Sequence, residues 1–415
     1  MLKIALLHYS APPIVGGVEH VIGHHAHLMA NAGHKVCIVA ARGTATNTQI
    51  EFRHLPLADS LHPEILHTKA QLDTGQVPSD FNQLINTIFT SLQKALTGCD
   101  LVIAHNIGSL HKNLALTAAL RQFCAQPDAP GLILWHHDLA WTMPRYQQEL
   151  HPGWPWQIIR EDWPEVRPRH VVISELRRQE LAQLTGLAPT VISVIPSGLD
   201  VSAFLKLAPQ TADLVQQLDL LSAAPLFLLP VRITERKNIE LAIRTVMAMR
   251  QTFPEATLVV TGPPDPHDPA SQTYFDRLKQ LRNESCSTSS GPKIHFLAEM
   301  VSECLPDAVI ADFYQLADAM LLPSYAEGFG IPMLEAALAG KPVFCTDIPS
   351  LREIAGEKAT YFSPDIHPDQ LAQSIVKQLS ADSVYCLRQH IRQNYLWDNI
   401  YTNRIRPLLQ MPHTH

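Results

Sequence analysis

Two glutamates eight positions apart stand out in the segment Pro323–Gly340, PSYAEGFGIPMLEAALAG. Glu327 lies in a glycine-rich turn and Glu335 follows that turn, so both side chains can face one ligand. Carboxylates accept hydrogen bonds from hydroxyl groups, which suits a sugar and a ribose, whereas they would repel a diphosphate placed beside them. The pair therefore indicates a site for a hydroxylated ligand.

The turn between the two glutamates predicts an anion site close by. Its glycines let the chain turn tightly after an apolar strand, and Pro332 suits the first turn of the helix that follows. A helix N-terminus in this position favours a negatively charged group such as a diphosphate. We expect Phe329, Gly330 and Ile331 to bind that part of the ligand.

A second loop supplies positive charge. The sequence RITERKN, from Arg232 to Asn238, directly follows an apolar strand. At the carboxyl end of that strand Arg232 offers a forked donor and Lys237 a point charge, and both can reach a phosphate. A solvated basic loop is the alternative, and the carboxylate turn in the same half of the chain favours the phosphate interpretation.

Polar or glycine-rich segments also follow two strands of the first half. Gly16 and Gly17 come after the first strand and open a helix, so their backbone N–H groups can meet a ligand, although G-x-G-x-x-G is not satisfied. The sequence WHHD ends another strand, where His137 beside Asp138 can bond a substrate hydroxyl. A structural capping role for Asp138 stays open.

Strands and helices alternate twice along the chain, which predicts two parallel sheets with both faces covered. In the first half we expect strands at Lys3–His8, Val36–Ala40, Leu101–Ala104, Leu132–Trp135 and Val171–Ile173. In the second half we expect them at Leu226–Pro230, Thr257–Thr261, Ile294–Phe296, Ala319–Leu322, Val343–Cys345 and Thr360–Phe362. Two doubly wound sheets bind ligands at the carboxyl ends of their strands.

The length of 415 residues fits two such domains. We expect the first at residues 1–196 and the second at 197–385, with a helical segment at 386–415 that returns to the first. The segment Trp141–Arg169 interrupts the alternation, either as a wall of a substrate pocket or as a surface excursion.

Composition narrows the classes of function. The net charge of -7 argues against nucleic acid as a partner. No apolar run is long enough to span a bilayer, and the first residues lack the features of a signal peptide, so we expect a cytoplasmic protein. The seven cysteines form no C-x-x-C pair. His20, His24 and His27 share one helical face, which a polar surface explains better than a metal site.

The combination of EGFGIPxxEA, RxxxxKN, the glycine pair after the first strand and the connector PSGLD resembles the retaining glycosyltransferases of the GT-B fold, glycosyltransferase family 4. The resemblance covers nearly the whole chain. It implies an α/β fold of two Rossmann-like domains that face each other across a cleft, with the acceptor on the first and the nucleotide-sugar donor on the second. Ser197 stands where asparagine is common in the connector.

The resemblance also implies a role for each matching residue. Glu327 is expected to contact the donor sugar, Glu335 the nucleotide ribose, Arg232 and Lys237 the diphosphate, and His137 the region near the donor sugar. No D-x-D triplet occurs, so we expect neither a metal nor another cofactor, and the two cations take over the charge that a metal would supply.

The acceptor is less well defined by the sequence. Polar and aromatic residues end the strands of the first half and suggest a small polar acceptor, and Arg145 can pair with a carboxylate or a phosphate unless it makes a surface ion pair. We expect a hexosyl group from GDP-mannose or UDP-glucose to be transferred to a sugar or glycerate derivative. A sugar-nucleotide-binding module without activity and a GT-B epimerase or phosphorylase are the alternatives.

Overall fold

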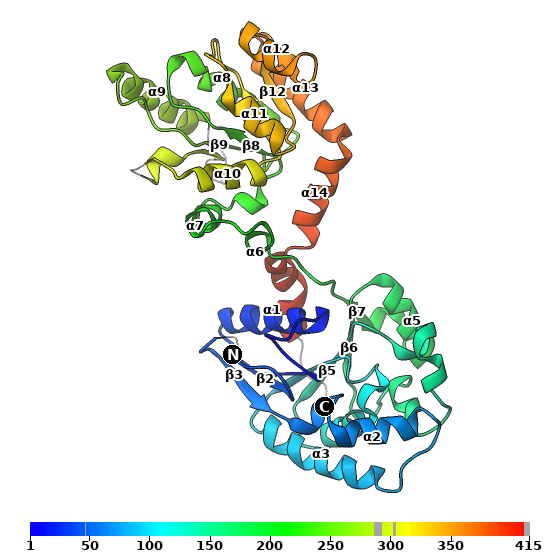
Figure 1. The fold of residues 1–415 in the computed structure, drawn as a ribbon. Helices are drawn as coiled ribbons and strands as arrows, with labels where there is room; N and C mark the ends of the chain where they lie inside the picture. The colour runs from blue at the N-terminus through cyan, green and yellow to red at the C-terminus, as the bar shows by residue number, and fades with distance from the viewer. Residues whose placement is uncertain (46, 286–292, 302–303, 411–415) are drawn as a thin grey trace. The chain divides into compact units, whose positions relative to one another are not determined.

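The computed structural model describes residues 1–45, 47–285, 293–301 and 304–410. The chain divides into two compact units (Figure 1). The first unit contains residues 1–198 together with the segment from 397 onward, and the second contains residues 199–396. Each unit has its own sheet and its own hydrophobic core.

The sheet of the first unit has seven parallel strands in the order β3-β2-β1-β4-β5-β6-β7. These strands are β1 (Lys3–Leu7), β2 (Lys35–Ala40), β3 (Ile50–His54), β4 (Leu101–His105), β5 (Gly131–His136), β6 (Arg169–Val172) and β7 (Ile192–Val194). The order reverses between β1 and β4, so the carboxyl ends of these two strands flank the crevice where such sheets bind ligands.

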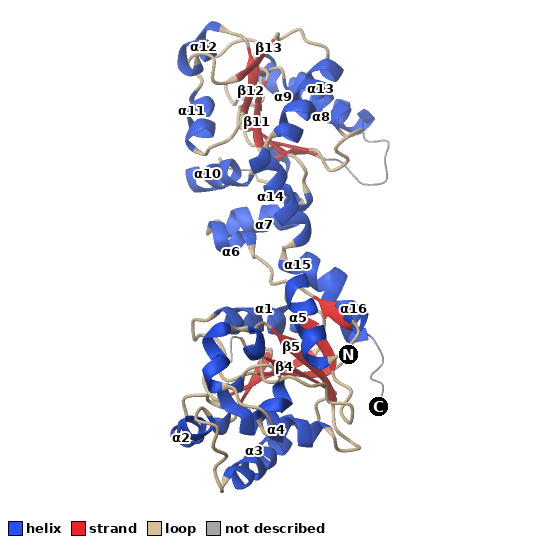
Figure 2. Cartoon of the chain, turned by 90° about the vertical axis from the view of Figure 1, so that its right-hand side faces the viewer, coloured by secondary structure: helices blue, strands red, loops and turns tan. Residues whose placement is uncertain are grey.

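Helices cover both faces of this sheet (Figure 2). The side chains of β1 alternate between the faces: Ile4 and Leu6 pack with α1, whereas Ala5 and Leu7 pack with α3 and α4. Because both faces are buried, the central strands are apolar throughout. The helices of this unit are α1 (Gly17–Asn31), α2 (Pro63–Leu72), α3 (Phe81–Leu96), α4 (Leu114–Cys124) and α5 (Glu175–Thr185).

The last described segment of the chain completes the core of the first unit. It contains α15 (Trp397–Ile400), the π-turn η10 (Tyr401–Ile405) and α16 (Arg406–Gln410). Trp397 stacks on His24 with ring centroids 5.1 Å apart, and Ile400 and Ile405 are buried beside α1 and the sheet. A Cβ atom on Gly198 would lie 2.5 Å from the Trp397 indole, so only glycine fits there.

The second unit has six parallel strands in the order β10-β9-β8-β11-β12-β13. The strands are β8 (Leu226–Leu229), β9 (Thr257–Val260), β10 (Ile294–Phe296), β11 (Ala319–Leu322), β12 (Val343–Thr346) and β13 (Thr360–Phe362). The helices are α6 (Val201–Leu205), α7 (Pro209–Gln217), α8 (Ile239–Met249), α9 (Pro269–Ser285), α10 (Asp307–Leu316), α11 (Ile331–Leu338), α12 (Pro349–Ala355), α13 (Pro368–Ala381) and α14 (Ser383–Asn394). Here the order reverses between β8 and β11, so the loops after these two strands are neighbours.

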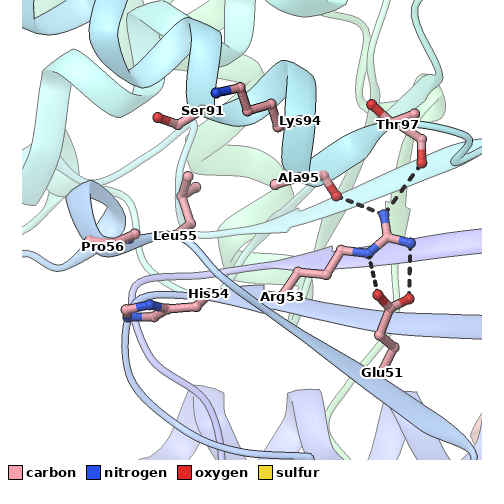
Figure 3. Close-up of a pocket in the computed structure, with 9 residues that line it drawn as sticks. All are labelled: Glu51, Arg53, His54, Leu55, Pro56, Ser91, Lys94, Ala95 and Thr97. Carbon is pink, nitrogen blue, oxygen red and sulfur yellow. Dashed lines mark hydrogen bonds and ion pairs between the residues drawn. The ribbon is translucent and has the colours of Figure 1, made fainter.

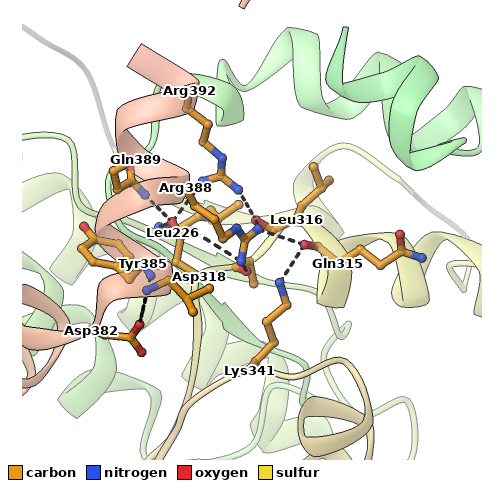
Figure 4. A network of polar contacts seen from close by, with 12 residues as sticks. Leu226, Gln315, Leu316, Asp318, Lys341, Asp382, Tyr385, Arg388, Gln389 and Arg392 are labelled. Atoms are coloured by element: carbon orange, nitrogen blue, oxygen red, sulfur yellow. Dashed lines mark hydrogen bonds and ion pairs between the residues drawn. The ribbon is translucent and has the colours of Figure 1, made fainter. Parts of the chain in front are cut away.

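Helix α14 belongs to the second unit, although we expected the returning segment to begin at residue 386. The buried carboxylate of Asp318 accepts hydrogen bonds from Arg392, Gln389 and the backbone N–H of Leu226 at 2.8–3.0 Å (Figure 4). Arg388 donates to the carbonyl of Ala317 at 3.1 Å. This network fixes α14 to the strands, which moves the start of the returning segment to Trp397.

The prediction of two parallel α/β sheets is confirmed, and all eleven predicted strands are present within one or two residues at their ends. Two strands were missed, β3 and β7, which form the edges of the first sheet.

The segment Trp141–Arg169 contains 3-10 turns η4 (Pro144–Glu149) and η5 (Trp156–Ile159), and Trp156 and Trp163 are buried in the core beside α3 and α4. Within the described ranges, no helix has the combination of length and apolarity that crossing a bilayer requires.

Candidate functional site

The glycine turn after β11 has the geometry that the sequence predicts. Gly330 caps the start of α11 with φ 108°, in the region that favours glycine, and a Cβ atom there would lie 2.7 Å from Cδ2 of Leu351. Pro332 lies in the first turn of the helix, where its missing N–H costs nothing. Phe329 and Ile331 are exposed on either side of Gly330. The turn therefore places two exposed apolar side chains beside the N-terminus of α11.

Glu327 lies in a dense set of hydrogen bonds at the start of this turn. Lys237 Nζ donates to both of its carboxylate oxygens at 2.6 Å, and Ser324 Oγ donates to Oε1 at 2.6 Å. Thr346 in turn donates to the backbone carbonyl of Ser324 at 2.6 Å. Arg236 approaches the same carboxylate at 3.7 Å. The carboxylate is thus held by side chains of two loops, those after β8 and β11, and Thr346 at the end of β12 supports the second loop.

The order of the strands brings Lys237 to Glu327. Lys237 ends the 3-10 turn η8 (Glu235–Lys237) after β8, and Glu327 follows β11, which pairs with β8 in the sheet. Burial lowers the pKa of Lys237, and the hydrogen bond and charge of Glu327 oppose that shift. The pair is thus a buried ion pair at the carboxyl edge of the sheet.

Glu335 has a different partner. The hydroxyl group of Tyr314 on α10 donates a hydrogen bond to Oε2 of Glu335 at 2.6 Å. Burial, together with this hydrogen bond, raises the pKa of Tyr314, so the phenol remains protonated and acts as the donor. Glu335 itself is exposed on the surface of α11. One oxygen is therefore oriented by Tyr314 while the side chain stays accessible to a ligand.

Arg232 is separate from the ion pair. Its guanidinium lies 3.7 Å from Asp265, and 59% of its side chain is exposed. The structure therefore brings Lys237 and Glu327 together, whereas Arg232 makes no contact with either of them. Arg232 follows β8 directly and is free to turn toward a ligand.

In the first unit, His137 lies at the end of β5 in a buried group of histidines. Its ring contacts His105 with nitrogens 3.1 Å apart, and its backbone N–H donates to Asn106 Oδ1 at 2.7 Å. Burial and the nearby His8 lower the pKa of His137 to about 3, so its ring is neutral at physiological pH. Asp138 donates its backbone N–H to the same Asn106 oxygen.

The glycine pair opens α1, but a carboxylate lies beside it. A Cβ atom on Gly16 would lie 2.0 Å from Oε2 of Glu19, and Ser10 Oγ donates to the other carboxylate oxygen at 2.5 Å. Glu19 therefore occupies the space next to the helix N-terminus, which disfavours a phosphate there. The geometry suits a hydroxyl group at this position better than an anion.

The three histidines that were predicted to share a polar face of α1 do not all contact one another. His20 and His24 approach each other with Nε2 atoms 3.0 Å apart, whereas His27 bonds Asn47.

A set of possible metal-ligating side chains occurs elsewhere in the described ranges, at Asp73, His111 and Glu149. Lys69 donates to both carboxylates of that set, at 2.6–2.8 Å, and so supplies the positive charge that a metal would bring.

A cavity of about 610 Å³ lies between β3 and α3 (Figure 3). Arg53 is fixed at its edge by Glu51 and by the carbonyl oxygens of Ala95 and Thr97. The residues that line it include none of the predicted site residues.

Sequence reasoning missed Arg236, Ser324 and Tyr314. Arg236 and Ser324 lie within the predicted loops, so their position next to the predicted residues was the available signal. Tyr314 lies on a helix that carries no motif, and its contact with Glu335 depends on how α10 packs beside α11.

Comparison with known protein families adds to this geometry. Residues 15–203 match the sequence model described as "Glycosyltransferase Family 4", and residues 212–395 match the one described as "Glycosyl transferases group 1". The first range falls almost entirely in the first unit and the second range in the second unit.

Two curated relatives carry the same name. Mannosylglucosylglycerate synthase from Petrotoga mobilis is 27% identical over 289 residues, which is 67% of this chain and 66% of that protein. The protein of that name from Thermotoga maritima is 24% identical over 368 residues, 82% of this chain and 80% of that protein. The chain thus spans just under two thirds of the first relative and four fifths of the second.

Among solved structures, a glycosyltransferase from Rickettsia africae aligns over 99% of both chains with a TM-score of 0.37 and 16% identity. The Anabaena protein HepE, solved in complex with UDP and glucose, aligns over 99% of this chain and 100% of that chain with a TM-score of 0.37 and 17% identity. The two matched sequence models together run through both units, and the chain belongs to the GT4-type family of group 1 glycosyltransferases.

Proposed function

We propose that the protein transfers a hexosyl group from a nucleotide sugar, GDP-mannose or UDP-glucose, to a small polar acceptor such as a sugar or glycerate derivative. The product keeps the anomeric configuration of the donor, and no metal takes part. The observation that carries the proposal is the joint presence, in the second unit, of the Lys237–Glu327 pair, the Gly330 turn and Glu335.

The relatives support the class of acceptor. Two of them are named mannosylglucosylglycerate synthase, and a third, 28% identical over 193 residues, is named D-inositol 3-phosphate glycosyltransferase. These names describe small hydroxylated acceptors that carry a carboxylate or a phosphate. An acceptor of that kind fits the polar ends of the strands in the first unit.

The barrier in such a reaction is charge separation between an oxocarbenium-like sugar and a departing diphosphate. Cations and helix N-termini that are already oriented toward the diphosphate stabilise its developing charge most effectively. Lys237, Arg232 and the N-terminus of α11 fill this role in the proposal. The acceptor hydroxyl attacks the anomeric carbon as the diphosphate leaves, and the leaving phosphate takes the hydroxyl proton, so no side chain needs to act as a general base and we assign no nucleophile to the protein.

The remaining residues orient the donor. Glu327 accepts hydrogen bonds from the hydroxyls of the sugar, and Glu335 accepts them from the ribose while Tyr314 holds its other oxygen. His137 has a neutral imidazole that can exchange a hydrogen bond with a sugar hydroxyl, the role that the family resemblance implies for it.

A donor screen tests the proposal. The protein is incubated with GDP-mannose, UDP-glucose and other nucleotide sugars, together with D-glycerate, glucosylglycerate and simple sugars, and the products are identified by mass spectrometry. We expect one donor to give a hexosylated product together with free nucleoside diphosphate. Nucleotide binding without any turnover would favour the binding-module alternative, and an epimerised donor would favour the epimerase.

A further inference from the structure

Two cysteines from different parts of the first unit line one small cavity. Cys37 lies in β2, and Cys99 lies in the turn between α3 and β4. The cavity has a volume of about 200 Å³ and adjoins the larger one between β3 and α3. Cys37 is part of the apolar core beneath α3 and α4, and Cys99 packs against the same core. The fold therefore brings together two thiols that lie far apart in the sequence.

The edge strand β3 carries a cation to the same cavity. Cys37 is level with Glu51 of β3 in the strand register, and Arg53 follows two residues later, so their side chains share one face of the sheet. The guanidinium of Arg53 donates to the Glu51 carboxylate at 2.9–3.0 Å and to two backbone carbonyl oxygens at the end of α3 (Figure 3). Its Nη1 also lies 3.6 Å from Sγ of Cys99. A fixed positive charge thus lies against one of the two thiols.

The two thiols differ in acidity. The contact with the Cys37 thiol and the charge of Arg53 lower the pKa of Cys99, whereas burial and Glu51 act in the opposite direction. The same contact between the thiols, together with burial, raises the pKa of Cys37. The thiolate is the nucleophilic form of a cysteine. Cys99 is therefore the better nucleophile of the pair, and Cys37 keeps its proton beside it.

The cavity suits a small molecule that carries negative charge. Cys99 is half-buried, so part of its side chain reaches solvent, whereas Cys37 is buried. Among the described residues that line the cavity, Lys3, Lys35 and Arg53 carry positive charge and only Glu51 carries negative charge. Local positive charge raises the concentration of anions nearby. A disulfide that bears carboxylates would therefore be attracted to the side of the cavity where Cys99 is accessible.

We propose that Cys99 and Cys37 form a redox-active dithiol, which a low-molecular-weight disulfide oxidises to a reversible Cys37–Cys99 disulfide. The Cys99 thiolate attacks one sulfur of the small disulfide, which forms a mixed disulfide and releases a thiolate. The Cys37 thiol then attacks the Cys99 sulfur and expels the second half of the small disulfide, which takes the proton of Cys37. The two protein thiols lose two electrons, and the small disulfide gains them.

This site is separate from the candidate site for glycosyl transfer. Lys3 and Lys35 begin β1 and β2, so the cavity lies at the amino ends of the strands, whereas sheets of this kind bind their substrates at the carboxyl ends. The proposal therefore stands independently of the proposed function, and its test needs neither a donor nor an acceptor. Neither cysteine belongs to a motif, because only the packing of the strands brings them together.

The test treats the full-length protein with oxidised glutathione and maps its peptides by mass spectrometry without reducing agent. We expect one pair of peptides joined through Cys37 and Cys99, which dithiothreitol separates again. In Cys37→Ser the reaction should stop at a mixed disulfide on Cys99, and in Cys99→Ser the Cys37 thiol should stay reduced. The wild-type map decides even if a variant fails to fold. A mixed disulfide that persists on Cys99 of the wild type, or two thiols that both stay reduced, overturns the proposal.

A second measurement tests the attacking thiol, with Cys386 as the reference in the same sample. Cys386 is exposed on α14, and its sulfur lies against backbone carbonyl oxygens instead of a cation. The quantity measured is the ratio of the iodoacetamide labelling rates of Cys99 and Cys386 at neutral pH. In Arg53→Gln this ratio should fall roughly 3-fold for each unit by which the pKa of Cys99 rises, because the loss of thiolate outweighs the gain in nucleophilicity.

Arg53→Lys is the matched variant, since it keeps the positive charge and should retain most of the wild-type ratio. An unchanged ratio in Arg53→Gln would show that the cation does not activate Cys99. An equal fall in Arg53→Lys and Arg53→Gln would show that Arg53 only shapes the turn. Either result overturns the assignment of Cys99 as a thiol activated by Arg53.

Discussion

Lys237 and Glu327 form a buried ion pair in which one ammonium group meets both carboxylate oxygens at 2.6 Å. Less than a tenth of either side chain is exposed. The pair joins the loop after β8 to the loop after β11, the two loops that the sequence predicts to hold the donor. A donor phosphate bound as proposed would approach a lysine that already has a partner. The same lysine would then serve both the stability of the unit and the proposed chemistry.

Replacing Lys237 by alanine should damage both properties. Removing one partner of a buried pair leaves an uncompensated charge and costs about 3–5 kcal/mol of unfolding free energy. The loss of an oriented cation should lower kcat on the order of 100- to 1,000-fold. Urea unfolding and steady-state kinetics measure the two effects. Near-normal turnover would show that this loop is only a basic surface.

A double substitution separates the two roles. In Lys237→Met with Glu327→Gln no charge is left unpaired, so most of the lost stability should return while turnover stays low. Recovery of turnover together with stability would mean that the pair is purely structural.

Arg232→Ala should lower turnover without lowering stability, because its side chain is mostly exposed and its nearest carboxylate is 3.7 Å away. We expect a loss of turnover of the same order as for Lys237→Ala, and the double variant Arg232→Ala/Lys237→Ala should lose much less than the product of the two. Arg232→Lys should recover part of the activity but not the forked contact. Circular dichroism checks that the fold is intact, and strictly multiplicative losses would argue against a shared phosphate.

The two glutamates should differ in kinetics. Glu335→Ala should raise KM for the donor, since a contact with the ribose contributes equally to ground and transition states, whereas Glu327→Ala should mainly lower kcat. Tyr314→Phe should reproduce a milder form of the Glu335→Ala effect because the carboxylate loses its orienting hydroxyl. Initial rates over a range of donor concentrations decide this, and unchanged constants for either glutamate would exclude that glutamate from the site.

Chelation should leave the enzyme active. If Arg232 and Lys237 supply positive charge to the diphosphate as proposed, activity should persist in EDTA. Proton NMR of the fresh product should find the anomeric configuration of the donor. Activity that returns only with Mg²⁺ or Mn²⁺ would contradict the role of the two cations. An inverted product would contradict the retaining mechanism.

Acid should destabilise the first unit. Burial lowers the pKa of His8 to about 4 and those of His25 and His137 to about 3, from an ordinary value of 6.5. As pH falls below 6.5 the unfolded chain binds protons on these side chains while the folded chain does not, so stability decreases from about pH 7 toward pH 4. Thermal unfolding midpoints across this range measure the slope.

The matched variants for this prediction are His25→Phe and His67→Phe. Both ring nitrogens of His25 are buried, and neither has a hydrogen-bond partner among the residues that the structure describes, so its replacement should flatten the dependence on pH. His67 is exposed on α2, and its replacement should leave the slope unchanged. A slope that is the same in all three proteins would show that the buried histidines do not cause it.

The predictable part of the fold is the part in which each strand is buried on both faces. Continuous apolar runs such as Leu226–Leu229 and Ala319–Leu322 were recognised because burial on both faces leaves no polar positions. The missed strands lie at the edges of the first sheet. IEFRH in β3 alternates polar residues with apolar ones, and β7 has only three residues.

The sequence alone singles out the residues of the candidate site, but it does not show which of them contact each other. Glu327 and Lys237 were identified separately, yet 90 residues separate them, and their contact exists because β8 and β11 are neighbours in the sheet. Strand order depends on how all the crossovers pack, which residue spacing does not encode. The carboxylate of Glu19 beside Gly16 was not predicted either. Its position depends on how the side chain folds back over its own helix, which the residue spacing does not encode.

The return of the chain to the first unit has a consequence for biosynthesis. Trp397, Ile400, Tyr401 and Ile405 fill the core between α1 and the first sheet, so this core stays incomplete until the ribosome has passed all of the second unit. The second unit is continuous in sequence and can close its own core earlier. During translation the second half of the chain is thus able to reach its final structure first, whereas the core of residues 1–198 is completed only when the segment from Trp397 onward leaves the ribosome.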